Sequence, residues 1–292
     1  MTDTSRVRVV ATSHGPLVVE ESGEHGTPLI LIHGNSTCRR VFQRQVQSQL
    51  SSRFRLITFD LPGHGQSADA ADPMRSYTLP GLADAVVELL AKLGITEAVI
   101  MGWSLGGHIG IEMIPRFPGM LGLILTGTPP IRPGGFAEGF LNSPHFQSAG
   151  RSVLSAADID VFAGAVFGEP MEGFVLDAMA RADGRFRHRL FEASRSGAGI
   201  DQRAAVEDTK VPTLVVNGAT DPLINLEYVE TVPYGNLWSG RCYRIRGVGH
   251  APFWQAPTDY NLLIERFVRD VAHPGWAVAG AASRDYRMQG RQ

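Results

Sequence analysis

Short apolar runs recur along the chain and alternate with longer stretches that carry apolar side chains at helical spacing. Two early runs, Val7–Ala11 and Leu17–Glu20, flank the turn His14-Gly15-Pro16 and predict a pair of strands. Six further runs predict strands at Pro28–Ile32, Phe54–Phe59, Ala98–Met101, Leu121–Leu125, Pro212–Val216 and Cys242–Ile245. Strands that are apolar throughout and are separated by helices are typical of a parallel sheet covered on both faces.

Helical spacing is clearest between and after these strands. The stretch Leu79–Leu93 repeats apolar residues at helical intervals and is followed by Gly94, which favours a helix end. A second helix is expected from Gly107, and an amphipathic helix at Asp259–Val271 closes the pattern. From 131 to 208 the strand signal is weak, and three runs read as helices: Asp158–Phe167, Met171–Ala182 and Phe186–Arg195.

These patterns predict an α/β fold with a mostly parallel eight-stranded sheet, flanking helices and an inserted helical cap. We assign 1–130 and 209–272 to the core, 131–208 to the cap and 273–292 to a loosely attached tail. The cap holds eight of the fourteen phenylalanines: Phe136, Phe140, Phe146, Phe162, Phe167, Phe174, Phe186 and Phe191. A segment of this length does not easily bury eight Phe side chains alone, so we expect some of them to face the site.

Composition excludes several classes of function. The formal net charge is -2 and no basic cluster is interleaved with aromatic residues, so nucleic-acid binding is not expected. No apolar run approaches the roughly 20 residues that span a bilayer, and the first residues do not resemble a secretory signal. Two cysteines, Cys38 and Cys242, form neither a disulfide framework nor a structural zinc site. We expect a cytoplasmic monomer or weak dimer without membrane insertion.

Candidate chemistry centres on Ser104. The pentapeptide Gly102–Gly106 (G-W-S-L-G) follows an apolar strand and opens a helix, the setting in which G-x-S-x-G forms a nucleophile elbow. Glycines on both sides remove side chains that would clash across so tight a turn, and the hydroxyl is thereby exposed. The sequence therefore predicts Ser104 as a nucleophile.

A serine nucleophile needs a base, and the base needs an orienting acid. His250 lies in a Gly- and Pro-bounded loop just after the last predicted strand, so it is the expected base. Asp221 follows the strand Pro212–Val216, whereas the loop after Leu125 offers no carboxylate, so Asp221 is the expected acid. His108, four residues after Ser104, is interpreted as structural.

The loop after Ile32 supplies the rest of the predicted site. An oxyanion needs two N–H donors, for which we predict Leu105 and Asn35; His33 and His64 are expected to hold loops in place. We also expect Asn35 and Trp103 to contact substrate. The chain has no zinc-hydrolase motif, no dinucleotide fingerprint and no P-loop, so no metal and no cofactor are predicted. A serine at the elbow also argues against epoxide hydrolases and dehalogenases.

Several longer segments resemble the α/β-hydrolase superfamily and, within it, the AidH-type metal-independent N-acyl-homoserine lactonases. The segments are Leu31–Ser36, Asp60–Gly65, Gly102–Met113, Thr126–Pro130 and Gly249–Phe253. The resemblance implies hydrolytic ring opening with Ser104, His250 and Asp221 as the triad and with Asn35 and Leu105 at the oxyanion. The chain departs from the family twice: Asp221 replaces a Glu, and Phe162 stands where a cap Tyr would contact substrate. We expect Phe162 to line the substrate site at that position without the polar contact.

The expected substrate is a small ester or lactone whose acyl chain packs against the cap. Hydrolysis through an acyl-enzyme on Ser104 and direct activation of water by His250 both remain open. So do three other functions on the same scaffold. These are a general carboxylesterase or another lactonase, a cofactor-free dioxygenase in which Ser104 matters less, and a ligand sensor without activity.

Overall fold

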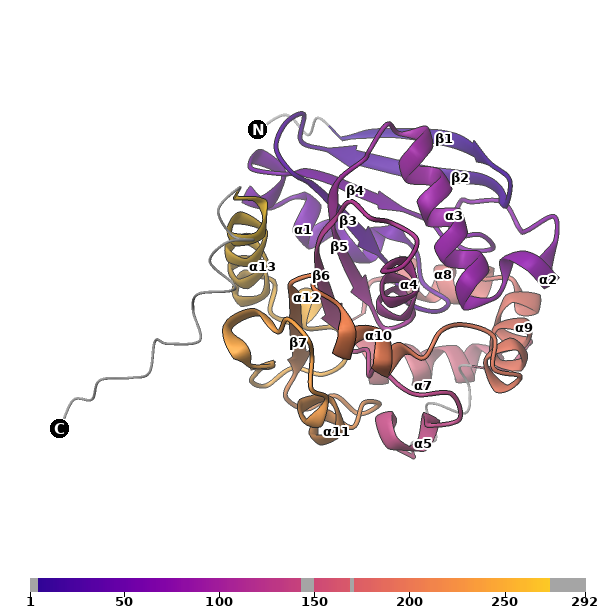
Figure 1. Cartoon of the computed structure of the whole chain (residues 1–292). Coiled ribbons are helices and arrows are strands. Elements are labelled where there is room, and N and C mark those ends of the chain that lie inside the picture. The colour runs from indigo at the N-terminus through magenta and orange to yellow at the C-terminus, as the bar shows by residue number, and fades with distance from the viewer. Residues whose placement is uncertain (1–4, 143–149, 169–170, 274–292) are drawn as a thin grey trace.

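The computed structural model describes residues 5–142, 150–168 and 171–273, and Figure 1 shows the whole chain. Its strands are β1 Arg6–Thr12, β2 Gly15–Ser22, β3 Pro28–Ile32, β4 Arg55–Phe59, β5 Ala98–Trp103, β6 Met120–Thr126, β7 Thr213–Gly218 and β8 Tyr243–Ile245. They form one eight-stranded sheet in the order β1-β2-β4-β3-β5-β6-β7-β8. Strand β2 runs antiparallel to both β1 and β4, and the other neighbours are parallel. The predicted α/β-hydrolase fold, with a mostly parallel eight-stranded sheet, is confirmed.

Helices cover both faces of this sheet. Successive residues of a strand point to opposite faces, and on β6 a side chain at Gly122 would meet Phe267, whereas Leu123 lies against Gly110. Phe267 belongs to α13 (Pro257–Ala272) and Gly110 to α4 (Leu105–Met113), so these two helices pack on opposite faces. Helix α3 (Leu79–Lys92) packs beside α4.

The short helices are α1 Gln43–Val46, α2 Pro73–Ser76, α11 Leu226–Thr231, α12 Pro252–Gln255 and three 3-10 turns at Arg39–Phe42, Gln49–Ser52 and Trp238–Gly240.

The segment between β6 and β7 is helical where the structure describes it. Its helices are α5 Phe136–Gly139, α7 Ala156–Phe167, α8 Gly173–Arg181, α9 Gly184–Arg195 and α10 Gln202–Asp208. Most of them gather beside the sheet, in the lower right part of Figure 1. Two hydrogen bonds from Asp183 fix α9 to the core: its carboxylate accepts one from Tyr77 Oη at 2.7 Å, and its N–H donates one to Gly63 O at 2.9 Å.

The element boundaries differ from the sequence-based prediction in a few places. Strand β5 continues to Trp103 because Trp103 still pairs with Thr126, and α4 begins at Leu105 rather than Gly107. Helix α10 was not predicted, because its sequence is mostly polar. Nine residues of the expected cap, 143–149 (which include Phe146) and 169–170, and residues 274–292 of the expected tail lie outside the described residues.

Candidate active site

Ser104 is the one residue between β5 and α4, and its backbone is strained. Its φ of 54° and ψ of -117° lie in a region that side chains other than glycine rarely adopt. The last residue of β6 and the loop after it hold this conformation from both sides. Ser104 N–H donates to Thr126 O at 2.8 Å, and Ser104 O accepts from Thr128 Oγ1 at 2.9 Å. The surrounding structure thus fixes the serine at the carboxyl end of the sheet.

Two glycines make this sharp turn possible because no other side chain fits. A Cβ atom on Gly102 would lie 2.2 Å from Gly106 O, and a Cβ on Gly106 would lie 2.0 Å from Ile32 O. Both distances are shorter than any real carbon–oxygen contact. The approach of Gly106 to the end of β3 brings Ser104 beside the loop that follows Ile32.

His250 and Asp221 meet at the same end of the sheet. His250 Nδ1 lies 2.8 Å from Asp221 Oδ2, and the two residues are 2% and 6% exposed. The other carboxylate oxygen, Oδ1, accepts backbone N–H groups from Leu223 at 2.9 Å and Ile224 at 3.2 Å, so the carboxylate cannot rotate away. Trp103 Nε1 donates to His250 O at 2.9 Å and holds the histidine loop from the elbow side.

Two buried histidines shape the loop that carries Asn35. His33 Nδ1 donates to Gly34 O at 2.8 Å and its Nε2 accepts from Leu61 N at 3.0 Å. His64 Nε2 accepts from Ser36 N at 3.1 Å. Burial lowers the pKa of both histidines, so each ring stays neutral and keeps one acceptor nitrogen. The expectation that His33 and His64 hold loops in place is confirmed.

An arginine of the helical segment also reaches this loop. Arg187 on α9 is 3% exposed, and its Nη1 donates to Ser36 Oγ at 3.1 Å. The Ser36 hydroxyl in turn donates to Asn35 Oδ1 at 2.9 Å. The remaining Arg187 donors bind the carbonyls of Arg151 and Ser152. Sequence reasoning missed Arg187, since a lone charged residue on a basic helix normally faces water.

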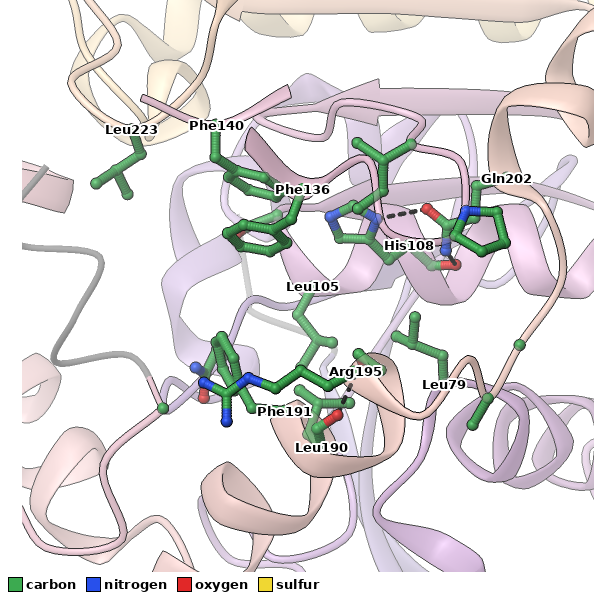
Figure 2. A pocket seen from close by; sticks show the side chains of 18 of the residues that line it. Leu79, Leu105, His108, Phe136, Phe140, Leu190, Phe191, Arg195, Gln202 and Leu223 are labelled. Atoms are coloured by element: carbon green, nitrogen blue, oxygen red, sulfur yellow. Dashed lines mark hydrogen bonds between the residues drawn. The ribbon is translucent and has the colours of Figure 1, made fainter. Parts of the chain in front are cut away.

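Ser104, His250, Asn35 and Leu105 all line one cavity of ≈ 800 Å³. The rest of its wall is largely apolar and comes from Leu79, Ile131, Phe136, Phe140, Phe162, Val166, Met179, Leu190, Phe191 and Leu223; part of it is drawn in Figure 2. Four of the seven phenylalanines that the structure describes in the segment 131–208 therefore face the cavity. Phe167 packs against Trp103, Phe186 packs against His64, and Phe174 packs against Trp254.

Trp103 and His108 also border the cavity. Trp103 is 1% exposed and its N–H donates to His250 O, so it positions the histidine loop in addition to lining the cavity. His108 bonds Gln202 through Nδ1, and its ring lies 6.0 Å from that of Phe140. The predicted contact of Trp103 with substrate stays a prediction.

The described residues contain no group of three or more His, Cys, Asp or Glu side chains that could hold a metal ion. Within the same residues, no helix has the length and apolar composition needed to cross a membrane.

Comparison with known proteins places this geometry in a family. Residues 29–261, which include Ser104, Asp221 and His250, match the alpha/beta hydrolase family. The chain belongs to the alpha/beta hydrolase family. Among curated relatives, this hydrolase is 30% identical to a pimeloyl-[acyl-carrier protein] methyl ester esterase of Aromatoleum aromaticum over 263 residues, 82% of this chain and 98% of the relative.

Among solved structures, the hydrolase is 45% identical to the N-acyl homoserine lactonase AidH complexed with N-butanoyl homoserine. The TM-score is 0.90, and the match covers 92% of this chain and 98% of AidH. A variant of AidH complexed with N-hexanoyl homoserine lactone gives the same identity and TM-score. An esterase of a Rhodococcus species shares the fold at 23% identity and a TM-score of 0.72, over 91% of this chain and 99% of the esterase.

Proposed function

We propose that this hydrolase opens the lactone ring of N-acyl-homoserine lactones and so quenches quorum-sensing signals. The observation that carries the proposal is the 45% identity to AidH over 92% of the chain. The site supports it: a serine, an Asp-oriented histidine and a loop of N–H groups lie at one end of a largely apolar cavity.

In this mechanism Ser104 Oγ attacks the lactone carbonyl while His250 takes its proton. Asp221 accepts the His250 Nδ1–H at 2.8 Å and stabilises the imidazolium that forms. The backbone N–H groups of Asn35 and Leu105 stabilise the oxyanion, each contributing about 3 kcal/mol to lowering the barrier. His250 then protonates the ring oxygen as it leaves. Water activated by His250 releases the N-acyl-homoserine and restores Ser104.

The helical segment 131–208 acts in this proposal as a cap that binds the acyl chain. Phe162 and its apolar neighbours line the cavity, and each CH₂ group buried there contributes about 0.8 kcal/mol. That value corresponds to a roughly fourfold gain in kcat/KM for each added CH₂ until the cavity is full. We also propose a cytoplasmic enzyme, which the free thiols of Cys38 and Cys242 favour.

Hydrolysis of an open-chain ester is the second candidate function. The 30% identity to the methyl ester esterase of Aromatoleum aromaticum favours it, and the same triad chemistry serves both substrates. An open-chain ester differs from a lactone in that its alcohol leaves the site before water enters.

A substrate panel separates the two. N-acyl-homoserine lactones from four to twelve acyl carbons, an aryl ester and a methyl ester are compared by kcat/KM, with Ser104→Ala as the blank. We expect a lactone to be the best substrate and the blank to lose turnover of every compound. If no lactone is opened faster than by the blank, the lactonase proposal is wrong. A blank that still consumes oxygen on an aromatic substrate would reveal dioxygenase chemistry instead.

A further inference from the structure

His108 is one of the polar residues of the cavity wall that have no part in the proposed triad or oxyanion loop. His108 lies on α4, one helical turn after Ser104, and its ring faces Phe140 at a centroid distance of 6.0 Å. Ser104 is the residue that immediately precedes this helix, and both residues line the same cavity. The imidazole is therefore accessible to a molecule bound in the cavity at Ser104.

Gln202 determines which ring nitrogen carries the proton. Gln202 is 3% exposed, and its amide makes two contacts with His108: Oε1 to Nδ1 at 2.6 Å and Nε2 to the backbone carbonyl at 3.3 Å. A carbonyl oxygen can only accept, so the Gln202 NH₂ group must face it. Gln202 Oε1 then faces Nδ1, which must be the protonated nitrogen. It follows that His108 Nε2 is an acceptor.

This acceptor faces the cavity. Figure 2 shows the bonded nitrogen turned toward Gln202 and the other ring nitrogen on the opposite side, toward Phe136 and Phe140. Burial lowers the pKa of His108 to about 4, so the ring is neutral at physiological pH. An acceptor in a largely apolar wall favours a ligand that brings a hydrogen-bond donor to the same place.

We propose that His108 Nε2 accepts a hydrogen bond from an amide N–H beside the attacked carbonyl, so that His108 selects α-acylamino lactones and esters. The inference rests on the proposed hydrolysis at Ser104. In such substrates the amide nitrogen is two bonds from the carbon that Ser104 attacks, so a substrate held at Ser104 places its N–H group in the cavity that His108 also lines. Replacing N–H with an ester oxygen would set one acceptor against another.

The test compares two isosteric lactones, N-hexanoyl-homoserine lactone and α-hexanoyloxy-γ-butyrolactone. We expect the wild-type enzyme to prefer the amide by roughly 10- to 100-fold in kcat/KM, because its site has an acceptor to satisfy. In His108→Leu the preference should fall to near unity, mainly through slower opening of the amide. Phe140→Leu is the matched control: it alters the same wall without removing an acceptor, so it should slow both lactones by a similar factor.

The possible outcomes are distinct. A wild-type enzyme without preference, or a preference that survives in His108→Leu, overturns the role of His108 while leaving lactone hydrolysis intact. If the wild-type enzyme opens neither lactone faster than Ser104→Ala, the proposed function fails and the inference fails with it.

A second measurement covers the case in which His108→Leu does not fold. In ¹⁵N-histidine-labelled Ser104→Ala, the His108 Nε2 resonance should shift on addition of the amide and not of the ester. A shift with both lactones, or with neither, overturns the inference.

Discussion

Ser104 combines a reactive position with an unfavourable backbone conformation. Its φ of 54° is held by Thr126 and Thr128 rather than by its own preference. Residues kept in such regions cost about 1–3 kcal/mol each, which the rest of the fold must offset. The elbow is therefore a place where function and stability conflict.

Replacing the serine should reveal this cost. Ser104→Gly removes the Cβ that makes the conformation unfavourable, whereas Ser104→Ala keeps it. Relief of this strain stabilises Ser104→Gly, whereas the greater conformational entropy of glycine in the unfolded chain destabilises it. As the net result, we expect the free energy of unfolding, measured by urea titration, to be about 1 kcal/mol higher for Ser104→Gly than for Ser104→Ala. Ala91→Gly, at an exposed site of α3, is the control and should lose about 1 kcal/mol. Equal stability of the two Ser104 variants would show that no strain is stored there.

Gly127 limits the position of His250, the proposed catalytic base. It has a φ of +60°, and a Cβ there would lie 2.7 Å from His250 Cε1. Gly127→Ala should displace the ring and lower kcat about 100-fold, since small misplacements of catalytic groups are costly. Gly94→Ala is a matched control, with a φ of +68° but open space around the added methyl. It should lose stability and keep kcat. Wild-type kcat in Gly127→Ala would contradict the expected displacement.

At the scale of elements, helix α9 of the segment 131–208 contacts the loop after β3, because Arg187 donates a hydrogen bond to Ser36. Arg187→Met should lower kcat about tenfold for lactones and esters alike, with little change in KM, because the Ser36 hydroxyl that donates to Asn35 Oδ1 loses the Arg187 contact that orients it. Ser36→Ala should add little to that loss in the double variant, since both changes interrupt the same contact. Steady-state kinetics of the single and double variants measures this.

The control for Arg187 is Arg185→Met on the same helix. The Arg185 side chain is 57% exposed and pairs with Asp183, and exposed ion pairs contribute 0–1 kcal/mol. Its kcat should remain close to that of the wild type. Fully additive losses from Arg187→Met and Ser36→Ala would contradict a shared role.

The sequence pattern predicted those elements in which consecutive residues are apolar and buried. Strand β3 was placed at Pro28–Ile32, as the structure has it, because every residue of the run is apolar and four of the five are buried. Helix α10 was missed because only two of its seven residues, Gln202 and Val206, are buried. A polar helix of this kind is defined by its partner, here His108 on α4, and not by its own periodicity.

Site residues, like helices and strands, were predictable where a local sequence pattern defines them and not where a distant partner does. Ser104, Asp221 and His250 could be proposed from sequence because each follows a predicted strand, and strand ends meet at one edge of a parallel sheet. Arg187 and the His108–Gln202 pair could not, since their partners lie 151 and 94 residues away in the chain. No local rule anticipates such contacts.

For the whole molecule, neutral histidines couple folding to pH. Burial lowers the pKa of His33, His64 and His108, the last to about 4, whereas an unfolded histidine has a pKa near 6.5. Below pH 6.5 the unfolded chain therefore binds protons that the folded chain does not, and stability falls as pH decreases. Each histidine contributes a slope of up to about 1.4 kcal/mol per pH unit between its two pKa values.

Urea unfolding from pH 7 to pH 5 tests this coupling. The free energy of unfolding should decrease throughout the range. In His108→Leu its dependence on pH should be shallower by up to about 1.4 kcal/mol per pH unit, which corresponds to one proton fewer taken up on unfolding. A free energy that stays constant from pH 7 to pH 5 would contradict the neutral state of these rings.

The adjacency of β6 and β7 has an evolutionary consequence. The two strands are neighbours in the sheet, and the apolar wall contributed by residues 131–208 lies between them in the sequence. Ser104, Asp221 and His250 all lie outside that interval. A recombination event that exchanged the interval would replace much of the surface against which an acyl chain packs and leave the strand order and the triad unchanged. Such an exchange would alter the substrate range and keep the triad, provided that the new segment also supplies a donor to Ser36 in place of Arg187.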